Sequence, residues 1–113
     1  MSISAEQLEA ARVVYSDAAV LRDGPYEFLF IPRLLIRVGA GDRLVDALLC
    51  PERHASGGYP TRLFLSEPIP YPGTANWRQD SIGGRTWHTW SWDRVPPSDC
   101  LLQVLAAHLR AFK

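Results

Sequence analysis

The sequence predicts a single α+β domain, with an antiparallel meander of strands between two helices. Three observations predict it: apolar residues at helical spacing near both ends, runs of branched and aromatic residues separated by turn signals, and a length of 113 residues, which suits one domain. Hydrophobic residues make up 47% of the chain and charged residues 21%. A packed core is therefore expected, and disorder is disfavoured.

Residues 5–17 are expected to form the first helix. Ser4-Ala-Glu-Gln7 resembles a capping box, in which the serine side chain accepts from the glutamine amide and the glutamine side chain reaches back. Apolar residues then recur at steps of three and four, as a helix face requires: Leu8, Ala11, Val14 and Tyr15.

Strands joined by tight turns are expected next. Asp23-Gly24-Pro25 predicts a turn, because glycine tolerates positive φ and proline fixes its own φ. Residues 26–38 are rich in aromatic and branched side chains and predict a strand. Pro32 interrupts it, so either two strands meet there or the strand lies at an edge. Two further strands and their connections follow: a turn at 39–42, a strand at 43–50, a loop at 51–58 and a strand at 61–65.

Residues 66–84 are expected to form a long irregular loop. Prolines alternate at three positions, Pro68, Pro70 and Pro72, and impose an extended path with few ladder donors. Loops of this length inside a compact domain are uncommon and are often functional.

A second helix is expected from about 98 to 112. Ser98 suits the N-cap and Asp99 suits the positive end of the helix dipole. The apolar stripe of this helix consists of Leu101, Leu102, Leu105, Leu109 and Phe112.

Charge and hydropathy disfavour several classes of function. Twelve Lys and Arg balance twelve Asp and Glu, so the formal net charge is 0, whereas nucleic acids and anionic membranes select a cationic excess. No apolar run approaches the roughly 20 residues that span a bilayer, and the N-terminus lacks the features of a secretory signal. We therefore expect a cytoplasmic protein whose main partner is neither nucleic acid nor membrane.

The two cysteines, Cys50 and Cys100, are interpreted as free thiols in a reducing compartment, with one disulfide as the alternative. Cys50 and His54 have ligand-like spacing, but no second spaced pair completes a zinc site, so no metal is expected. Cys100 is expected to be a small buried residue; the alternative is a thiol activated by the helix dipole. His108 is expected to be exposed or half-buried on the last helix.

Three tryptophans occur within six residues of the segment Arg85-Thr-Trp-His-Thr-Trp-Ser-Trp-Asp93. One interpretation is structural: the rings form a core plug that anchors the long loop to the final helix. The other is functional. If the segment is extended, Trp87, Thr89 and Ser91 share one side, and the two hydroxyls are candidate nucleophiles. Candidate helpers for them are His88, Asp93 and Asn76.

Three motifs occur in order along the chain: Gly58-Tyr59-Pro60, Trp87-His-Thr-Trp-Ser91 and Pro97-Ser-Asp-Cys-Leu101. Together they resemble a prokaryotic family of ubiquitin-conjugating-enzyme-like (E2-like) proteins found in bacterial ubiquitination-like operons. Trp92-Asp-Arg-Val-Pro-Pro97 likewise resembles the Trp-x-Pro stretch that leads into a helix in E2 proteins. The resemblance implies an α+β fold of the E2 type in one minimal domain over residues 1–113. Its elements are an N-terminal helix, a four-stranded antiparallel meander, a long irregular loop and a C-terminal helix.

The resemblance also implies an acyl carrier. Such a carrier accepts the C-terminal acyl group of a ubiquitin-like protein from an E1-like adenylating enzyme, which performs the ATP step, so no cofactor is implied. Ordinary E2 proteins use a cysteine that is absent here between residues 51 and 99. The prokaryotic family is thought to use a hydroxyl, as an oxyester.

Individual residues match this pattern unequally. Ser91 matches the serine of the family motif, and Thr89 is the second candidate. Asn76 is a loose counterpart of the asparagine that polarises the acyl carbonyl. The Arg-His that follows the family's serine is Trp92-Asp93 in this chain. His88 or Asp93 would therefore have to act as the base.

Two alternatives remain open. The same fold without catalysis would serve as a scaffold that binds a ubiquitin-like or E1-like partner. An unrelated α+β binding module would instead use the tryptophans to line a ligand groove.

Overall fold

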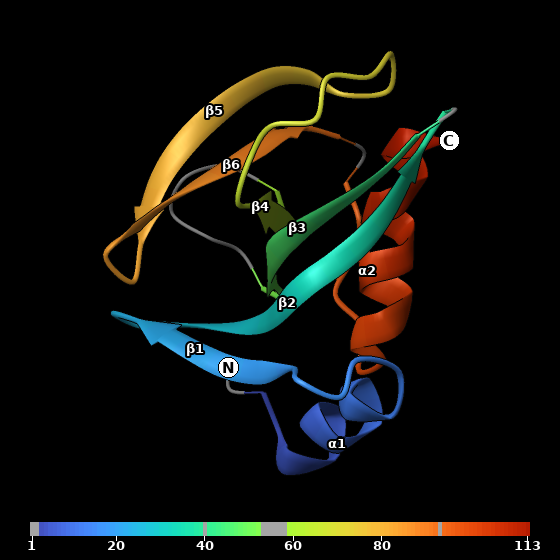
Figure 1. Ribbon diagram of the computed structural model, residues 1–113. Helices are drawn as coiled ribbons and strands as arrows, with labels where there is room; N and C mark the ends of the chain where they lie inside the picture. Colours follow the sequence, from blue (N-terminus) through green and yellow to red (C-terminus); the bar gives the residue numbers. More distant parts are fainter. Residues whose placement is uncertain (1–2, 40, 53–58, 93) are drawn as a thin grey trace.

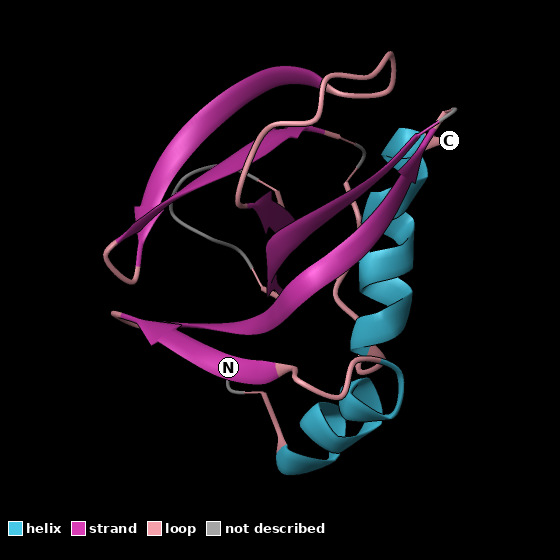
Figure 2. Ribbon diagram, viewed as in Figure 1, coloured by secondary structure: helices cyan, strands magenta, loops and turns pink. Residues whose placement is uncertain are grey.

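The computed structural model describes residues 3–39, 41–52, 59–92 and 94–113. These residues form an α+β fold with two α-helices and one antiparallel sheet of six strands in the order β1-β2-β3-β4-β6-β5 (Figures 1 and 2). In chain order the elements are α1 (Ala5–Val14), β1 (Ala19–Asp23), β2 (Tyr26–Val38), β3 (Gly41–Cys50), β4 (Arg62–Leu65), β5 (Ala75–Ile82), β6 (Arg85–Ser91), α2 (Leu101–Leu109) and a 3-10 turn, η1 (Arg110–Phe112).

Helix α1 begins as the sequence predicts. The Ser4 hydroxyl accepts from the Gln7 amide at 3.1 Å, and the Gln7 side chain accepts from the Ser4 amide at 2.8 Å, which completes the capping box. The helix ends at Val14 and not at residue 17. The chain then enters β1, a strand that the sequence analysis did not anticipate.

The first three strands follow the predicted turns. Gly24 adopts φ 59° in the two-residue turn between β1 and β2, a conformation that glycine adopts without steric cost. Neither alternative predicted at Pro32 is found, because β2 continues through it and lies between β1 and β3; the proline instead lies at a bulge, where the pairing with β3 shifts between Ile31 and Leu34. Arg33 lies in this bulge with φ 52°, and its amide donates to Asp46 Oδ1 at 2.9 Å.

The sequence predicts a four-stranded meander followed by an irregular loop over 66–84. Both parts of this prediction are wrong, because the second half of the expected loop is a strand and the sheet is larger. Residues 75–82 form β5, which pairs with β6. The sheet therefore has six strands among the residues described. β6 joins the earlier strands through β4 at one register pair, Leu65↔His88. The two strands diverge beyond that pair.

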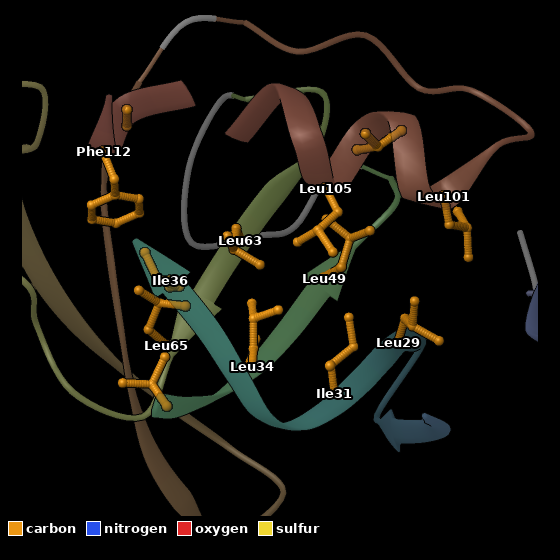
Figure 3. Packing of buried hydrophobic residues seen from close by; sticks show 14 of the residues in the cluster. Leu29, Ile31, Leu34, Ile36, Leu49, Leu63, Leu65, Leu101, Leu105 and Phe112 are labelled. Atoms are coloured by element: carbon orange, nitrogen blue, oxygen red, sulfur yellow. The ribbon is translucent and has the colours of Figure 1, made fainter. Parts of the chain in front are cut away.

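Both faces of the sheet are covered. On one face, the larger apolar core packs against α2 and η1 (Figure 3), with Leu34, Leu63 and Leu105 among its members. The other face holds a second core around Phe28, Phe64 and Trp87. The sheet curls over this second core (Figure 1), and the β5–β6 turn approaches β1, where a Cβ built on Gly83 would lie 3.4 Å from Leu21 Cδ2.

The remaining part of the expected loop, 66–74, is packed against the end of the chain. Ile69 is buried in the larger core, and the Thr74 hydroxyl accepts from the Tyr71 amide at 3.0 Å. A Cβ built on Gly73 would lie 2.0 Å from the Ala111 carbonyl oxygen. Only glycine permits this close approach of two backbones, so η1 fixes where β5 begins.

The C-terminal helix starts later than predicted. Its N-cap is Cys100, which makes no side-chain capping bond. Ser98, the predicted N-cap, lies two residues before the observed one, and its hydroxyl accepts from the Cys100 amide at 3.2 Å in the preceding turn. Neither α-helix in the described ranges has the length and apolar character needed to cross a membrane.

Candidate functional site

The tryptophan-rich segment is strand β6, and its side chains alternate between the two cores. Trp87 is 1% exposed and lies in the core under the curled sheet, whereas Trp90 is 3% exposed and lies against α2. Trp92 Nε1 donates to the Ala107 carbonyl at 3.0 Å. The structural interpretation of the tryptophans is therefore confirmed: they plug both cores and tie the strand to the final helix.

Ser91 and Asn76 are brought together by a second bulge. Ala75 pairs with Ser91, but the register shifts before Arg78, so β5 holds one extra residue there. Asn76 occupies this bulge with φ 56°. Its side-chain amide donates to the half-buried Ser91 hydroxyl at 3.4 Å, which is long for a hydrogen bond. The serine is therefore neither enclosed nor tightly bonded.

Thr89 is in a different environment. It is 1% exposed, its hydroxyl donates to the Leu63 carbonyl at 2.8 Å, and it accepts from Arg62 Nε at 3.1 Å. Its proton and a lone pair are thus engaged inside the protein, and an incoming carbonyl group has no access to it. We do not retain Thr89 as a candidate nucleophile.

The candidate bases are not brought to the serine. His88 is half-buried, and in the alternating pattern of β6 it belongs to the face opposite Ser91. Asp93 lies outside the residues described. Within the described ranges, no histidine or carboxylate side chain is hydrogen-bonded to the Ser91 hydroxyl.

A buried polar cluster that no sequence pattern predicted lies between the diverging ends of β4 and β6. Thr61 Oγ1 donates to the Val95 carbonyl at 2.8 Å and lies 2.9 Å from His108 Nε2. Because the threonine proton is already used, Nε2 carries the hydrogen of this contact. Arg62 borders the same cluster and is 5% exposed.

His108 is buried, so the expectation of an exposed or half-buried residue is wrong. Burial lowers the pKa of His108 to about 4, and the Arg62 charge adds to this effect. One signal in the sequence pointed to this position, since His108 follows Leu101, Val104 and Leu105 at the spacing of the apolar stripe.

The two cysteines are free, as predicted. Cys50 is buried, and burial raises the pKa of its thiol to about 11. Cys100 is exposed, so its expected burial is wrong. The described residues contain no group of three His, Cys, Asp or Glu that could hold a metal ion.

A cavity of about 280 Å³ lies between the start of α1 and the segment before α2. It is lined by Ile3, Gln7, Pro51, Glu52, Pro97, Ser98 and Asp99. None of the predicted site residues that the structure describes borders this cavity.

No family model, curated protein or solved structure matches the chain significantly.

Proposed function

We propose that this protein is an E2-like acyl carrier in a bacterial ubiquitin-like conjugation pathway, with Ser91 as the residue that carries the acyl group. The observation that carries the proposal is the pair formed by Ser91 and Asn76. A half-buried hydroxyl lies 3.4 Å from an amide donor that an exposed strand bulge positions. The three motifs that resemble the E2-like family support the same assignment. The E2 fold itself is part of the proposal.

The pair suits acyl transfer. Ser91 Oγ would attack the activated carbonyl at the C-terminus of the ubiquitin-like protein, held as a thioester on the E1-like enzyme. The Oγ–C bond forms, the C–S bond breaks, and the hydroxyl proton ends on the released thiol. The Asn76 amide would stabilise the oxyanion of the tetrahedral intermediate. An amine would then attack the ester and release Ser91.

One observation favours a second candidate, a non-catalytic scaffold for the ubiquitin-like or E1-like partner. A serine needs a base to become a good nucleophile, and no described histidine or carboxylate is hydrogen-bonded to Ser91. In this role the same fold would bind its partner without forming a covalent bond.

An adduct assay separates the two candidates. The protein is mixed with its operon's E1-like enzyme, ubiquitin-like protein and ATP, and the products are treated with thiol or with hydroxylamine. We expect an adduct that survives thiol, is cleaved by hydroxylamine, and maps to Ser91 by mass spectrometry. Ser91→Ala should abolish it, whereas Ser81→Ala, at an exposed serine of β5, should not.

Two further outcomes are informative. An adduct that thiol removes, and that Cys50→Ala or Cys100→Ala abolishes, would contradict the oxyester. No adduct with active partners, together with retained binding, would establish the scaffold. Asn76→Gly removes the amide while keeping φ 56° accessible, and should slow adduct formation by about a hundredfold if the amide is an oxyanion donor.

A further inference from the structure

Arg62 is a buried cation that forms no ion pair with any carboxylate in the described parts of the chain. It is 5% exposed, and its Nε donates to Thr89 Oγ1 at 3.1 Å. Its Nη1 is buried and has no hydrogen-bond partner. Within the described ranges, no carboxylate lies at ion-pair distance from this guanidinium. Buried arginines are normally paired, because an unpaired buried charge is costly.

The surroundings of Arg62 hold an excess of positive charge. Arg78, the cross-strand partner of Thr89, extends from β5 on the same face. Asp80 is the one acidic residue described in this group: its Oδ2 lies 3.9 Å from Arg78 Nε, is buried, and has no hydrogen-bond partner among the described residues. Two guanidinium groups thus face one carboxylate. Burial lowers the pKa of Arg62, and the Arg78 charge lowers it further, as expected for two cations held near each other.

Arg62 lines a small cavity together with Tyr59, Thr89 and His108, and Arg78 is not among the described residues of its lining. The cavity has a volume of about 10 Å³, which is room for about one water molecule. The half-buried Tyr59 closes one side, with its ring centre 4.6 Å from Arg62 Cζ. Thr89 is held in place by Leu63, so the unpaired Nη1 lies in a preformed polar setting.

We propose that Arg62 and Arg78 form a binding site for a single carboxylate. One carboxylate oxygen would replace the water that the cavity admits, and the remainder of the ligand would extend past the Tyr59 ring. The charge balance favours a monoanion over a phosphate dianion, since one negative charge neutralises the group. Guanidinium groups also pair with planar carboxylates through parallel hydrogen bonds.

The site neighbours the proposed carrier residue but does not depend on it. Thr89, which holds Arg62, and Ser91 are two residues apart on one face of β6. A carboxylate on an incoming chain would therefore bind beside Ser91. The site remains testable whether or not Ser91 carries an acyl group.

Acetate titration of the ¹⁵N-labelled protein tests the proposal, with the backbone amide resonance of Thr89, the residue bonded to Arg62, as the readout in every variant and the Arg62 Nε–H resonance as a second readout where the arginine is present. We expect a saturable shift with acetate that sodium chloride at equal ionic strength does not produce. Arg78→Gln removes a half-exposed partner and should weaken acetate binding by about fivefold. Arg62→Gln should weaken it more than about tenfold.

Arg37→Gln is the matched control, because Arg37 is exposed on β2 and pairs across the sheet with Asp42. It should leave acetate binding unchanged. A shift that is linear in acetate, or identical in chloride, would mean that water alone satisfies Nη1 and would overturn the proposal. So would unchanged binding in Arg78→Gln, a result that stands even where Arg62→Gln fails to fold.

Discussion

Thr89 and Ser91 are two hydroxyl residues on the same face of one strand, yet their environments differ. Thr89 follows the last register pair between β4 and β6, and its buried hydroxyl bonds across the gap to Leu63 and Arg62 of β4. At Ser91 the neighbour is Asn76, in an exposed bulge. The comparison shows that the neighbouring strand, and not the hydroxyl itself, decides which of the two side chains is held in the interior.

The two thiols extend this comparison and give the largest expected effect. Cys50 is buried at the end of β3 and donates to the Glu52 carbonyl at 3.0 Å, whereas Cys100 is exposed. With a disulfide reagent at neutral pH, we expect Cys100 to react at least about a thousandfold faster, because Cys50 reacts only after local opening. Cys100→Ser should abolish the fast phase, so that only the slow reaction of Cys50 remains. Two fast phases would show that the end of β3 opens readily.

The second largest effect is a loss of stability in acid, caused by the buried His108. The unfolded chain binds a proton at His108 near its ordinary pKa of 6.5, while the folded protein resists it until the pKa of about 4. The contribution of neutral His108 to the free energy of unfolding is therefore fully present above about pH 6.5. The free energy of unfolding falls by about 3 kcal/mol as the pH drops to about 4. Urea unfolding across this range measures the loss.

Two histidine variants make this test specific. His108→Gln should flatten the pH dependence between these two values, since the amide can still hydrogen-bond to Thr61 without titrating. His88→Gln, which replaces a half-buried histidine of β6, should leave the pH dependence of the unfolding free energy unchanged. If His108→Gln retained the full slope, another group would be responsible.

Thr89→Val and Ser91→Ala compare the two hydroxyls directly. Thr89→Val leaves the Leu63 carbonyl and Arg62 Nε without their partner in the interior, at a cost of about 2 kcal/mol in unfolding free energy. Ser91→Ala removes one long bond at the surface and should change stability by less than about 0.5 kcal/mol. Equal effects in urea denaturation would contradict the division between them.

The smallest effect concerns the backbone at Asn76. Its φ of 56° is left-handed, so Asn76→Ala should cost about 1 kcal/mol, whereas Asn76→Gly should cost nothing or stabilise slightly. Thermal unfolding of the two variants measures this. If the alanine variant were as stable as the glycine variant, the bulge would not hold Asn76 in that conformation.

Local chemistry made much of the fold predictable. The capping box at Ser4 and the turn at Gly24 each act on their own neighbours, and each was found where the sequence placed it. Strand β5 was missed because it is a mostly exposed edge strand with polar residues and no apolar alternation. Its structure comes from pairing with β6 and from the contact at Gly73, both of which are non-local.

The site was only partly predictable for the same reason. Alternation along an extended segment correctly placed Thr89 and Ser91 on one face. It could not reveal that β4 and β6 diverge, which buries Arg62 and encloses Thr89. The proximity of Asn76 to Ser91 depends on an extra residue in β5, and no single position in the sequence announces that residue.

The one-pair junction between β4 and β6 has a consequence for how the molecule responds to cooling. The hairpin of β5 and β6 is attached to the rest of the sheet by few backbone hydrogen bonds and largely by the buried indoles of Trp87 and Trp90. Attraction between apolar surfaces weakens near the freezing point, whereas hydrogen-bonded ladders do not share that dependence. The hairpin, with Ser91 at its end, should therefore be the first part of this protein to loosen in the cold.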